Sequence, residues 1–198
     1  MPVARLVIAT NVNDILARAL ASGQYRLSRV MATTSPSMDI QVSSNFERLL
    51  FEVYDRDGAA VAGLMDELAR SGGFALSQGA LEAIKADFEA GRADDAETSA
   101  EIRNTYAGTG FLADPHTAIG LAVGRRFSEP DVPMVSLATA HAAKFPAAVK
   151  AAAGVDAKLP AKLGDILTKP ERFATLANDR KAVENHIVAH TRVLVEKV

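Results

Sequence analysis

Residues 5–23 read RLVIATNVNDILARALASG, and this stretch predicts a strand followed directly by a helix. The nearly unbroken apolar run Arg5–Thr10, rich in β-branched residues, is typical of a parallel strand covered on both faces. Helix-capping side chains follow at 11–14, apolar residues then recur with helical spacing, and Gly23 is a helix stop. A strand–turn–helix opening of this kind indicates an α/β fold.

The remaining sequence predicts far more helix than strand. A second buried strand is expected at Pro133–Ala138, and a third at Tyr25–Met31 if that segment pairs. Apolar periodicity and helix stop signals indicate helices at 46–54, 59–70, 78–90, 97–106, 117–126, 145–152 and 178–198. So few parallel strands cannot form a covered sheet by themselves. We therefore expect an incomplete, mostly parallel sheet whose other strands lie elsewhere, followed by C-terminal helices.

Two polar segments interrupt this pattern. Residues 33–45 are rich in Ser, Thr, Asp, Asn and Pro, which predicts a loop, and polar loops between apolar elements often carry binding sites. The acidic pair Asp94-Asp95 lies between two predicted helices, and we expect it to be a solvated surface.

The composition excludes several classes of function. The 198 residues carry 22 basic and 24 acidic side chains, a formal net charge of -2, which argues against a nucleic-acid-binding surface. The absence of cysteine excludes thiolate metal sites and cysteine nucleophiles, and it fits a reducing cytosol. No apolar run approaches the ~20 residues that a membrane span needs, and no secretory signal is recognisable. We expect a soluble, cytoplasmic protein with neither nucleic-acid nor membrane partners.

Four strings along the chain resemble motifs of the threonine synthases of the bacterial and fungal kind. They are LVIATNVNDIL at 6–16, TSPSMDIQVSSNFERLLF at 34–51, DPHTAIG at 114–120 and LATAHAAKFP at 137–146. The strings occur in the same order as in the family, and the chain resembles only the C-terminal half of these enzymes. Met1-Pro2 would fall inside a continuous domain of that family, so we expect the N-terminus to be a truncation.

The resemblance implies a fold-type-II pyridoxal-phosphate enzyme, related to the tryptophan synthase β subunit. Residues 1–150 would form the C-terminal part of its large domain, and residues 151–198 a C-terminal helical extension. The implied reaction, a lyase step of threonine biosynthesis, converts O-phospho-L-homoserine and water to L-threonine and phosphate. Two rivals stay open: a related pyridoxal-phosphate lyase of hydroxy-amino acids, and a non-catalytic binding or decoy module that pairs with a complete synthase.

The family's Schiff-base lysine and its phosphate-cradling Gly-Asn-Phe-Gly loop belong to the N-terminal half, and neither string occurs here. We therefore expect no catalytic residue in this chain, no turnover by the chain alone, and the N-terminal half of the same enzyme as its partner. Lys144 is the only lysine within a matched motif, and nothing in the sequence shields it from water.

The resemblance also suggests cofactor-binding and substrate-binding residues. The Thr139 hydroxyl would bind the pyridine nitrogen of pyridoxal 5'-phosphate, although Thr139 could equally be a helix cap. The substrate-binding candidates are Ser35, Ser37, Asp39, Asn45, Arg48, His116 and Thr117. Each has a structural alternative, because such residues also form turns, cap helices or make surface ion pairs. Ala142 stands where the family has proline, which puts the geometry around Thr139 in doubt.

A metal site is not expected. His186 and His190 have a spacing that can chelate a metal, but no third ligand is evident, and packing is the favoured interpretation.

Overall fold

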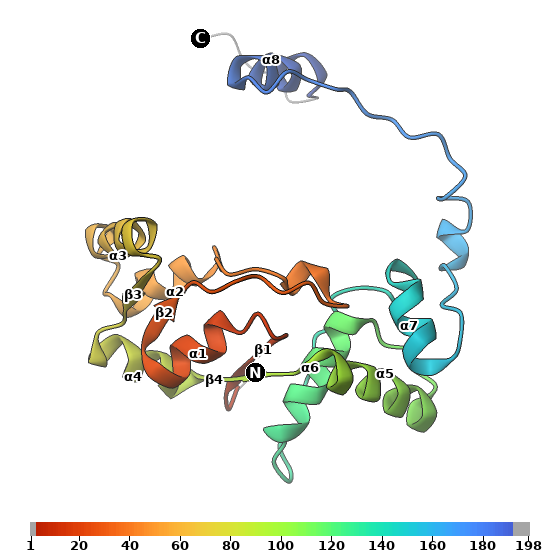
Figure 1. Cartoon of the computed structure of the whole chain (residues 1–198), viewed down its shortest axis with the longest axis horizontal. Helices are drawn as coiled ribbons and strands as arrows, with labels where there is room; N and C mark the ends of the chain where they lie inside the picture. Colours follow the sequence, from red (N-terminus) through yellow and green to blue (C-terminus); the bar gives the residue numbers. More distant parts are fainter. Residues whose placement is uncertain (1–2, 192–198) are drawn as a thin grey trace. The chain divides into compact units, whose positions relative to one another are not determined.

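The computed structural model describes residues 3–191 and divides the chain into two units, Met1–Lys158 and Leu159–Val198 (Figure 1). The first unit contains β1 (Leu6–Thr10), α1 (Ile15–Ser22), β2 (Gln24–Arg26), a 3-10 turn η1 (Pro36–Met38), α2 (Phe46–Val53), α3 (Gly58–Ser71), β3 (Gly73–Ala75), α4 (Gln78–Asp87), β4 (Phe88–Arg92), α5 (Asp95–Thr109), α6 (Pro115–Arg126), η2 (Ala142–Lys144) and α7 (Pro146–Ala153). The second unit contains η3 (Ala161–Leu163) and α8 (Arg180–His190). The predicted division into 1–150 and 151–198, as parts of a larger enzyme, stays a prediction.

The second unit has no hydrophobic core within its described residues. Helix α8 confirms the first part of the predicted closing helix, whose residues 192–198, including Leu194 and Val198, lie outside the described residues. The other two residues of the expected apolar stripe, Val183 and Ile187, are exposed. Across residues 3–191, no helix is sufficiently long and apolar to span a membrane.

The first predicted strand and helix are confirmed, and β1 has a partner that the sequence patterns did not identify. β1 pairs in parallel with β4, from Leu6 opposite Phe88 to Thr10 opposite Arg92. The helix expected at 78–90 therefore ends at Asp87, and its last three residues belong to a strand. The apolar Phe88 and Ala90 contact the main core and flank the exposed Glu89, so the segment has the period of two typical of a strand. The apolar spacing of the predicted helix at 78–90 continues into residues 88–90, so the sequence pattern did not reveal that a strand begins there.

The segment at 25–31 pairs only over its first residues. β2 forms a short antiparallel ladder with β3, with Tyr25 opposite Phe74. Glycine is required at position 73, because a Cβ there would lie 2.7 Å from the Tyr25 carbonyl oxygen.

The predicted strand at 133–138 is wrong for this chain. The segment is irregular and mostly exposed, with Val135 at 71% and Leu137 at 76% of full exposure. An apolar, β-branched run becomes a strand only where a neighbouring strand supplies its hydrogen bonds, and no strand within residues 3–191 does so. Thr139 consequently follows an unpaired segment rather than a sheet strand.

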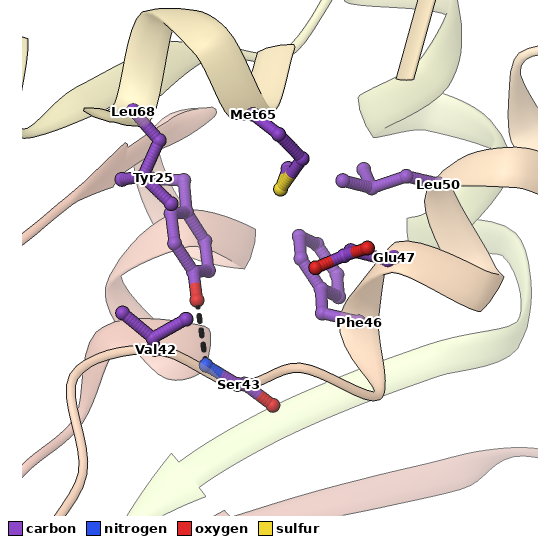
Figure 2. Close-up of a pocket in the computed structure, with 8 residues that line it drawn as sticks. All are labelled: Tyr25, Val42, Ser43, Phe46, Glu47, Leu50, Met65 and Leu68. Carbon is purple, nitrogen blue, oxygen red and sulfur yellow. Dashed lines mark hydrogen bonds between the residues drawn. The ribbon is translucent and has the colours of Figure 1, made fainter. Parts of the chain in front are cut away.

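The main core lies among α1, α2, α3, α4 and the two short sheets. Its aromatic centre is Tyr25, whose ring stacks between Phe46 and Phe74, with centroids 5.4 and 4.8 Å away. The Tyr25 hydroxyl accepts a hydrogen bond of 2.8 Å from the Ser43 backbone N–H, beside a cavity of about 10 Å³ (Figure 2). Burial raises the pKa of Tyr25, the Ser43 hydrogen bond opposes this, and nearby Glu47 adds to it. The core therefore ties the end of the 27–45 loop to β2.

Helices α5, α6 and α7 form a second packed group. Ile102, Ala113, Ala118 and Ala152 make its buried centre. The Arg125 guanidinium contacts the buried Glu101 carboxylate, with Nε and Nη2 at 3.0 and 2.9 Å from Oε1 and Nε also 3.1 Å from Oε2. This ion pair joins α5 to α6 at the edge of the group.

The acidic pair at 94–95 does more than face solvent. Asp94 caps α5 by accepting the Glu97 N–H at 2.9 Å, and the Glu97 carboxylate accepts the Asp94 N–H at 3.0 Å. Asp95 accepts the Thr34 hydroxyl at 2.9 Å. The expectation of a merely solvated surface was therefore incomplete, because Asp95 also joins α5 to the polar loop.

Candidate functional site

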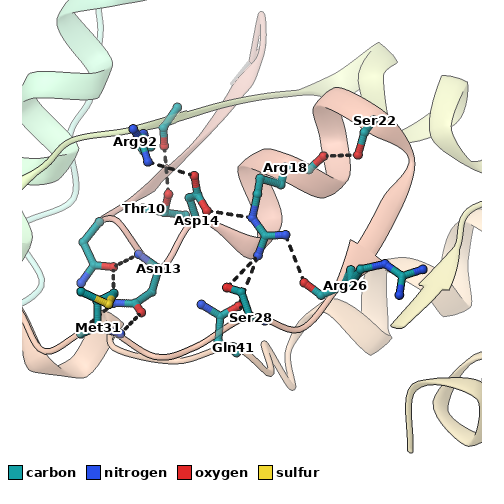
Figure 3. A network of polar contacts seen from close by, with 12 residues as sticks. Thr10, Asn13, Asp14, Arg18, Ser22, Arg26, Ser28, Met31, Gln41 and Arg92 are labelled. Atoms are coloured by element: carbon teal, nitrogen blue, oxygen red, sulfur yellow. Dashed lines mark hydrogen bonds and ion pairs between the residues drawn. The ribbon is translucent and has the colours of Figure 1, made fainter. Parts of the chain in front are cut away.

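The turn that follows β1 carries two buried asparagines that hold the polar loop. The Asn11 side chain is 1% exposed, and its Nδ2 lies 2.9 Å from Thr33 Oγ1 and 3.0 Å from Ser35 Oγ. Asn13 accepts the Met31 N–H at 2.8 Å and donates to the Met31 carbonyl at 2.9 Å (Figure 3). Ligands of open α/β sheets bind beyond the carboxyl ends of strands, which is where this loop is held.

The Asp39 carboxylate is saturated by donors from the same chain. Its Oδ1 lies 2.7 Å from Asn11 Nδ2, 3.0 Å from Asn13 Nδ2 and 2.7 Å from the Thr33 hydroxyl. Its Oδ2 accepts the Thr33 backbone N–H at 2.9 Å. A carboxylate with this many short contacts closes the loop from Thr33 to Asp39 on itself.

Arg18 on α1 holds the beginning and the end of the longer segment 26–41 (Figure 3). Its Nε binds Asp14 at 2.9 Å, and its Nη1 donates to the Arg26 carbonyl at 3.1 Å. Its Nη2 lies 3.3 Å from Gln41 Oε1. One guanidinium on a short helix therefore joins two parts of the segment that are distant in sequence.

A second cluster of polar side chains, Asp114, His116 and Thr117, lies at the start of α6, distant in sequence from the polar loop at 33–39. Asp114 is 1% exposed, and its carboxylate accepts the His116 backbone N–H at 2.9 Å and the Thr117 hydroxyl. Its Oδ1 also lies 2.9 Å from His116 Nδ1. Burial alone would raise the pKa of Asp114, but the hydrogen bonds from Thr117 and His116 outweigh it and hold this pKa below 3.8.

His116 brings the two polar groups together. Its Nε2 lies 3.3 Å from the Ser37 backbone N–H, across 79 residues of sequence. Its ring packs against Phe145, with 4.7 Å between the centroids. The loop at 33–39, the start of α6 and the residue before α7 thus meet at one place.

The structure brings five of the predicted site residues together and separates the other three from them. The gathered residues are Ser35, Ser37, Asp39, His116 and Thr117. Asn45 and Arg48 hydrogen-bond to each other at the start of α2, and the described contacts do not join their side chains to the group. Thr139 is exposed and makes no hydrogen bond within residues 3–191. Its predicted alternative role as a side-chain helix cap is not seen, since His141 caps η2 by accepting the Ala143 N–H at 3.1 Å.

Sequence reasoning missed Asn11 and Asn13 as part of this site. The available signal was their position, because polar side chains directly after a buried strand lie at the sheet edge where ligands bind. The sequence pattern predicts both residues as helix caps, yet the N-cap of α1 is Asp14, which makes no side-chain cap hydrogen bond.

The histidine pair at 186 and 190 packs as stacked rings 4.1 Å apart, and His190 Nδ1 lies 2.8 Å from the His186 carbonyl oxygen. Over the described part of the chain, no group of three His, Asp or Glu side chains could hold a metal ion.

In an α/β fold, polar loops gathered beyond the carboxyl end of a parallel strand lie where such folds bind their ligands, so the chain belongs to the class of α/β domains with a candidate ligand site at the sheet edge. The family description "Threonine synthase, C-terminal" matches residues 117–187. The threonine synthase of Pseudomonas aeruginosa is 41% identical over 192 residues, 96% of this chain and 41% of that protein. The threonine synthase of Saccharomyces cerevisiae is 34% identical, over 100% of this chain and 42% of that protein.

Solved structures agree with the sequence relatives. The crystal structure of PLP-bound threonine synthase from Brucella melitensis matches this chain with a TM-score of 0.86 and 54% identity. The match covers 97% of this chain and 41% of the Brucella melitensis chain. The crystal structure of yeast threonine synthase matches with a TM-score of 0.79 and 36% identity, and this match covers 94% of this chain and 42% of the yeast chain. This chain belongs to the threonine synthase family, and it spans about 41% of the length of the relatives that it matches. The expected α/β class and the resemblance are thereby confirmed.

Proposed function

We propose that this chain is the C-terminal part of a pyridoxal-phosphate-dependent threonine synthase of fold type II. Its reaction is the conversion of O-phospho-L-homoserine and water to L-threonine and phosphate, a lyase step of threonine biosynthesis. The observation that carries the proposal is the 97% coverage of this chain by the Brucella melitensis structure at a TM-score of 0.86. The gathered motifs at 33–39 and 114–117 support it, since they belong to the strings that resemble the family.

Thr139 fits the role of a cofactor ligand. Its exposed hydroxyl has no hydrogen-bond partner within the described residues and is free to bind the pyridine nitrogen. When bound, the cofactor supplies an electron-withdrawing ring that acidifies the carbon next to the substrate amine. The turn beyond Thr139 is held although Ala142 replaces the family's proline, because His141 Nδ1 accepts the Ala143 N–H and Ala142 is buried.

On the substrate side, the free polar group of the gathered loop is the exposed Ser37 hydroxyl, which has no hydrogen-bond partner in residues 3–191. The Ser35 hydroxyl is buried against Asn11, and the Thr117 hydroxyl donates to Asp114. We assign Ser37 to direct contact with the substrate, while Ser35, Asp39 and Thr117 hold the surrounding backbone in the binding conformation.

Asn45 and Arg48 are proposed as donors for the substrate phosphate. The Arg48 guanidinium contacts the Asn45 side-chain oxygen near the N-terminus of α2, and both residues are exposed. A guanidinium beside a helix N-terminus offers the charge and the N–H groups that bind a dianion.

The chain's own lysine in a matched motif does not suit Schiff-base chemistry. Lys144 is exposed, and its Nζ lies 5.9 Å from the Phe145 ring centroid. A Schiff-base lysine acts in a closed pocket that excludes water. The proposal therefore assigns the catalytic lysine to the N-terminal half of the enzyme, which is the expected partner, and places the assembled enzyme in the cytoplasm.

A chimeric enzyme tests the proposed function. This chain would replace the matching segment of the Brucella melitensis threonine synthase, and phosphate release and threonine formation from O-phospho-L-homoserine would be measured. We expect turnover by the chimera and by its parent, and none by the isolated 198-residue chain.

Two results would contradict the proposal. The first is a chimera that folds and binds pyridoxal 5'-phosphate but makes no threonine. Activity of this chimera on phosphoserine, serine or threonine instead would favour a related lyase, and inactivity on every substrate would favour the non-catalytic module. The second is turnover by the isolated chain, which would show that the lysine assignment is wrong.

A further inference from the structure

We infer that His116 is a positioning residue, which acts as a neutral imidazole with its proton on Nδ1 and holds the Ser37 backbone in place, instead of exchanging protons with the substrate. The inference rests on the proposed function, because it concerns how the substrate loop is held. Its structural part can nevertheless be tested without turnover.

The two neighbours of His116 fix its protonation state. The Asp114 carboxylate can only accept, so His116 Nδ1, 2.9 Å from Oδ1, carries the hydrogen of that contact. The Ser37 backbone N–H can only donate, so His116 Nε2, 3.3 Å away, offers its lone pair. One neutral tautomer satisfies both contacts, whereas the other tautomer and the imidazolium each place two donors against one another.

Both ring nitrogens are therefore occupied within the chain. A general acid or base must reach a substrate proton directly or through one water, and it must change its own protonation state. His116 could accept a proton on Nε2 only by giving up the Ser37 contact. Its ring is also buried against Phe145, which leaves little room for rotation.

His116 supplies one of two anchors for the loop. The first anchor lies at the turn after β1, where Asn11 and Asn13 bind Ser35, Thr33 and Asp39. The second is the His116 contact, which joins the loop tip at Ser37 to the start of α6. With both anchors present, the Ser37 backbone, which carries the exposed hydroxyl, is held in place relative to α6.

Nitrogen-15 NMR of the histidine-labelled 198-residue chain tests the tautomer. At neutral pH we expect the Nδ1–H tautomer for His116. His141 is an internal control of opposite sign, because its Nδ1 accepts the Ala143 N–H and its proton is therefore expected on Nε2. A His116 signal of the Nε2–H tautomer, or of an imidazolium, overturns the inference whether or not the chain takes part in threonine synthesis.

Kinetics of the chimera test the role. H116F keeps an aromatic ring against Phe145 but removes both hydrogen bonds, and we expect the KM for O-phospho-L-homoserine to rise about tenfold with a smaller change in kcat. H116Q can offer its amide oxygen to the Ser37 N–H and should recover most of the KM, with the pH profile unchanged. A proton-transfer role predicts instead that both variants lose roughly 10²–10⁴-fold in kcat together with one limb of the pH profile. That result would overturn the inference, and a chimera without any turnover would count against the proposed function while the NMR result still decides the tautomer.

Discussion

The hydroxyl of Tyr25 should stabilise the fold through a single hydrogen bond, and the variant Y25F isolates it. The ring is 2% exposed and stacked on both faces, so phenylalanine keeps the packing. In the parent chain the Ser43 backbone N–H donates to the Tyr25 oxygen at 2.8 Å, and Y25F leaves this N–H without an acceptor. Leaving a buried donor unsatisfied costs about 1–3 kcal/mol, and the partial burial here favours the lower half of that range.

Tyr54 offers a matched control. Its hydroxyl accepts the Ser77 backbone N–H at 3.0 Å in an exposed setting, where water can take its place. We expect Y54F to lower the free energy of unfolding by less than about 0.5 kcal/mol. Urea unfolding of the 198-residue chain, followed by far-UV circular dichroism, compares the two variants with the parent. Equal losses in Y25F and Y54F, or no loss in Y25F, would refute the argument.

Tyr25 should also make the stability of the fold depend on pH in the alkaline range. The pKa of Tyr25 is raised in the folded chain above its ordinary value of 10.0, so folding favours the neutral phenol. This contribution to stability is complete below pH 10.0 and is lost as the pH rises through the folded value. Y25F should therefore unfold with a weaker pH dependence in that alkaline range than the parent, as measured by urea midpoints.

Three further predictions concern a carboxylate in each anchor of the loop and one glycine. D39N places an amide among donors and should lower the free energy of unfolding by about 1–3 kcal/mol, with faster hydrogen exchange in the 33–39 loop. Folding lowers the pKa of Asp114 below 3.8, so the ionised carboxylate stabilises the folded chain above pH 3.8, and this stabilisation is lost as the pH falls through the folded value. D114N should therefore remove this acid dependence from the urea unfolding midpoints. G91A should lower the free energy of unfolding by about 1–3 kcal/mol, because its Cβ would lie 2.8 Å from Val123 Cγ1. The control G79A, whose Cβ would meet no atom within 4 Å beyond its own helix backbone, should be neutral or stabilising, and urea unfolding of the 198-residue chain compares the two variants.

The sequence predicted elements whose signals are local. The strand at 6–10 and the helix after it were predicted correctly, and Gly23 ends that helix with a φ of 74° as a stop signal should. The helices at α2, α3, α5, α6 and α7 were likewise predicted within a few residues of their observed ends. Capping side chains and apolar stripes act within a few residues, so they can be interpreted without knowing the rest of the fold.

The errors lie where pairing between distant segments decides the structure. The first three residues of β4 were predicted as helix, because the strand that pairs with them, β1, is far away in the sequence. The segment at 133–138 was predicted as a strand, but it finds no partner in the described residues. The site shows the same limit. The motif strings identified Ser35, Ser37 and His116, but not that Asn11 or Asn13 would bind the loop, since that contact depends on where the chain returns.

The pairing of Leu6 with Phe88 also has a consequence for the order of assembly. On a ribosome, β1 emerges long before its only described partner, and every element from α1 to α4 is made in between. Closing so long a loop is entropically costly, so we expect the pairing of β1 with β4 to form late, after the helices between them have been made. In that interval the edge of β1 that β4 covers in the folded unit is open to mispairing, and chaperone protection during synthesis would reduce that risk.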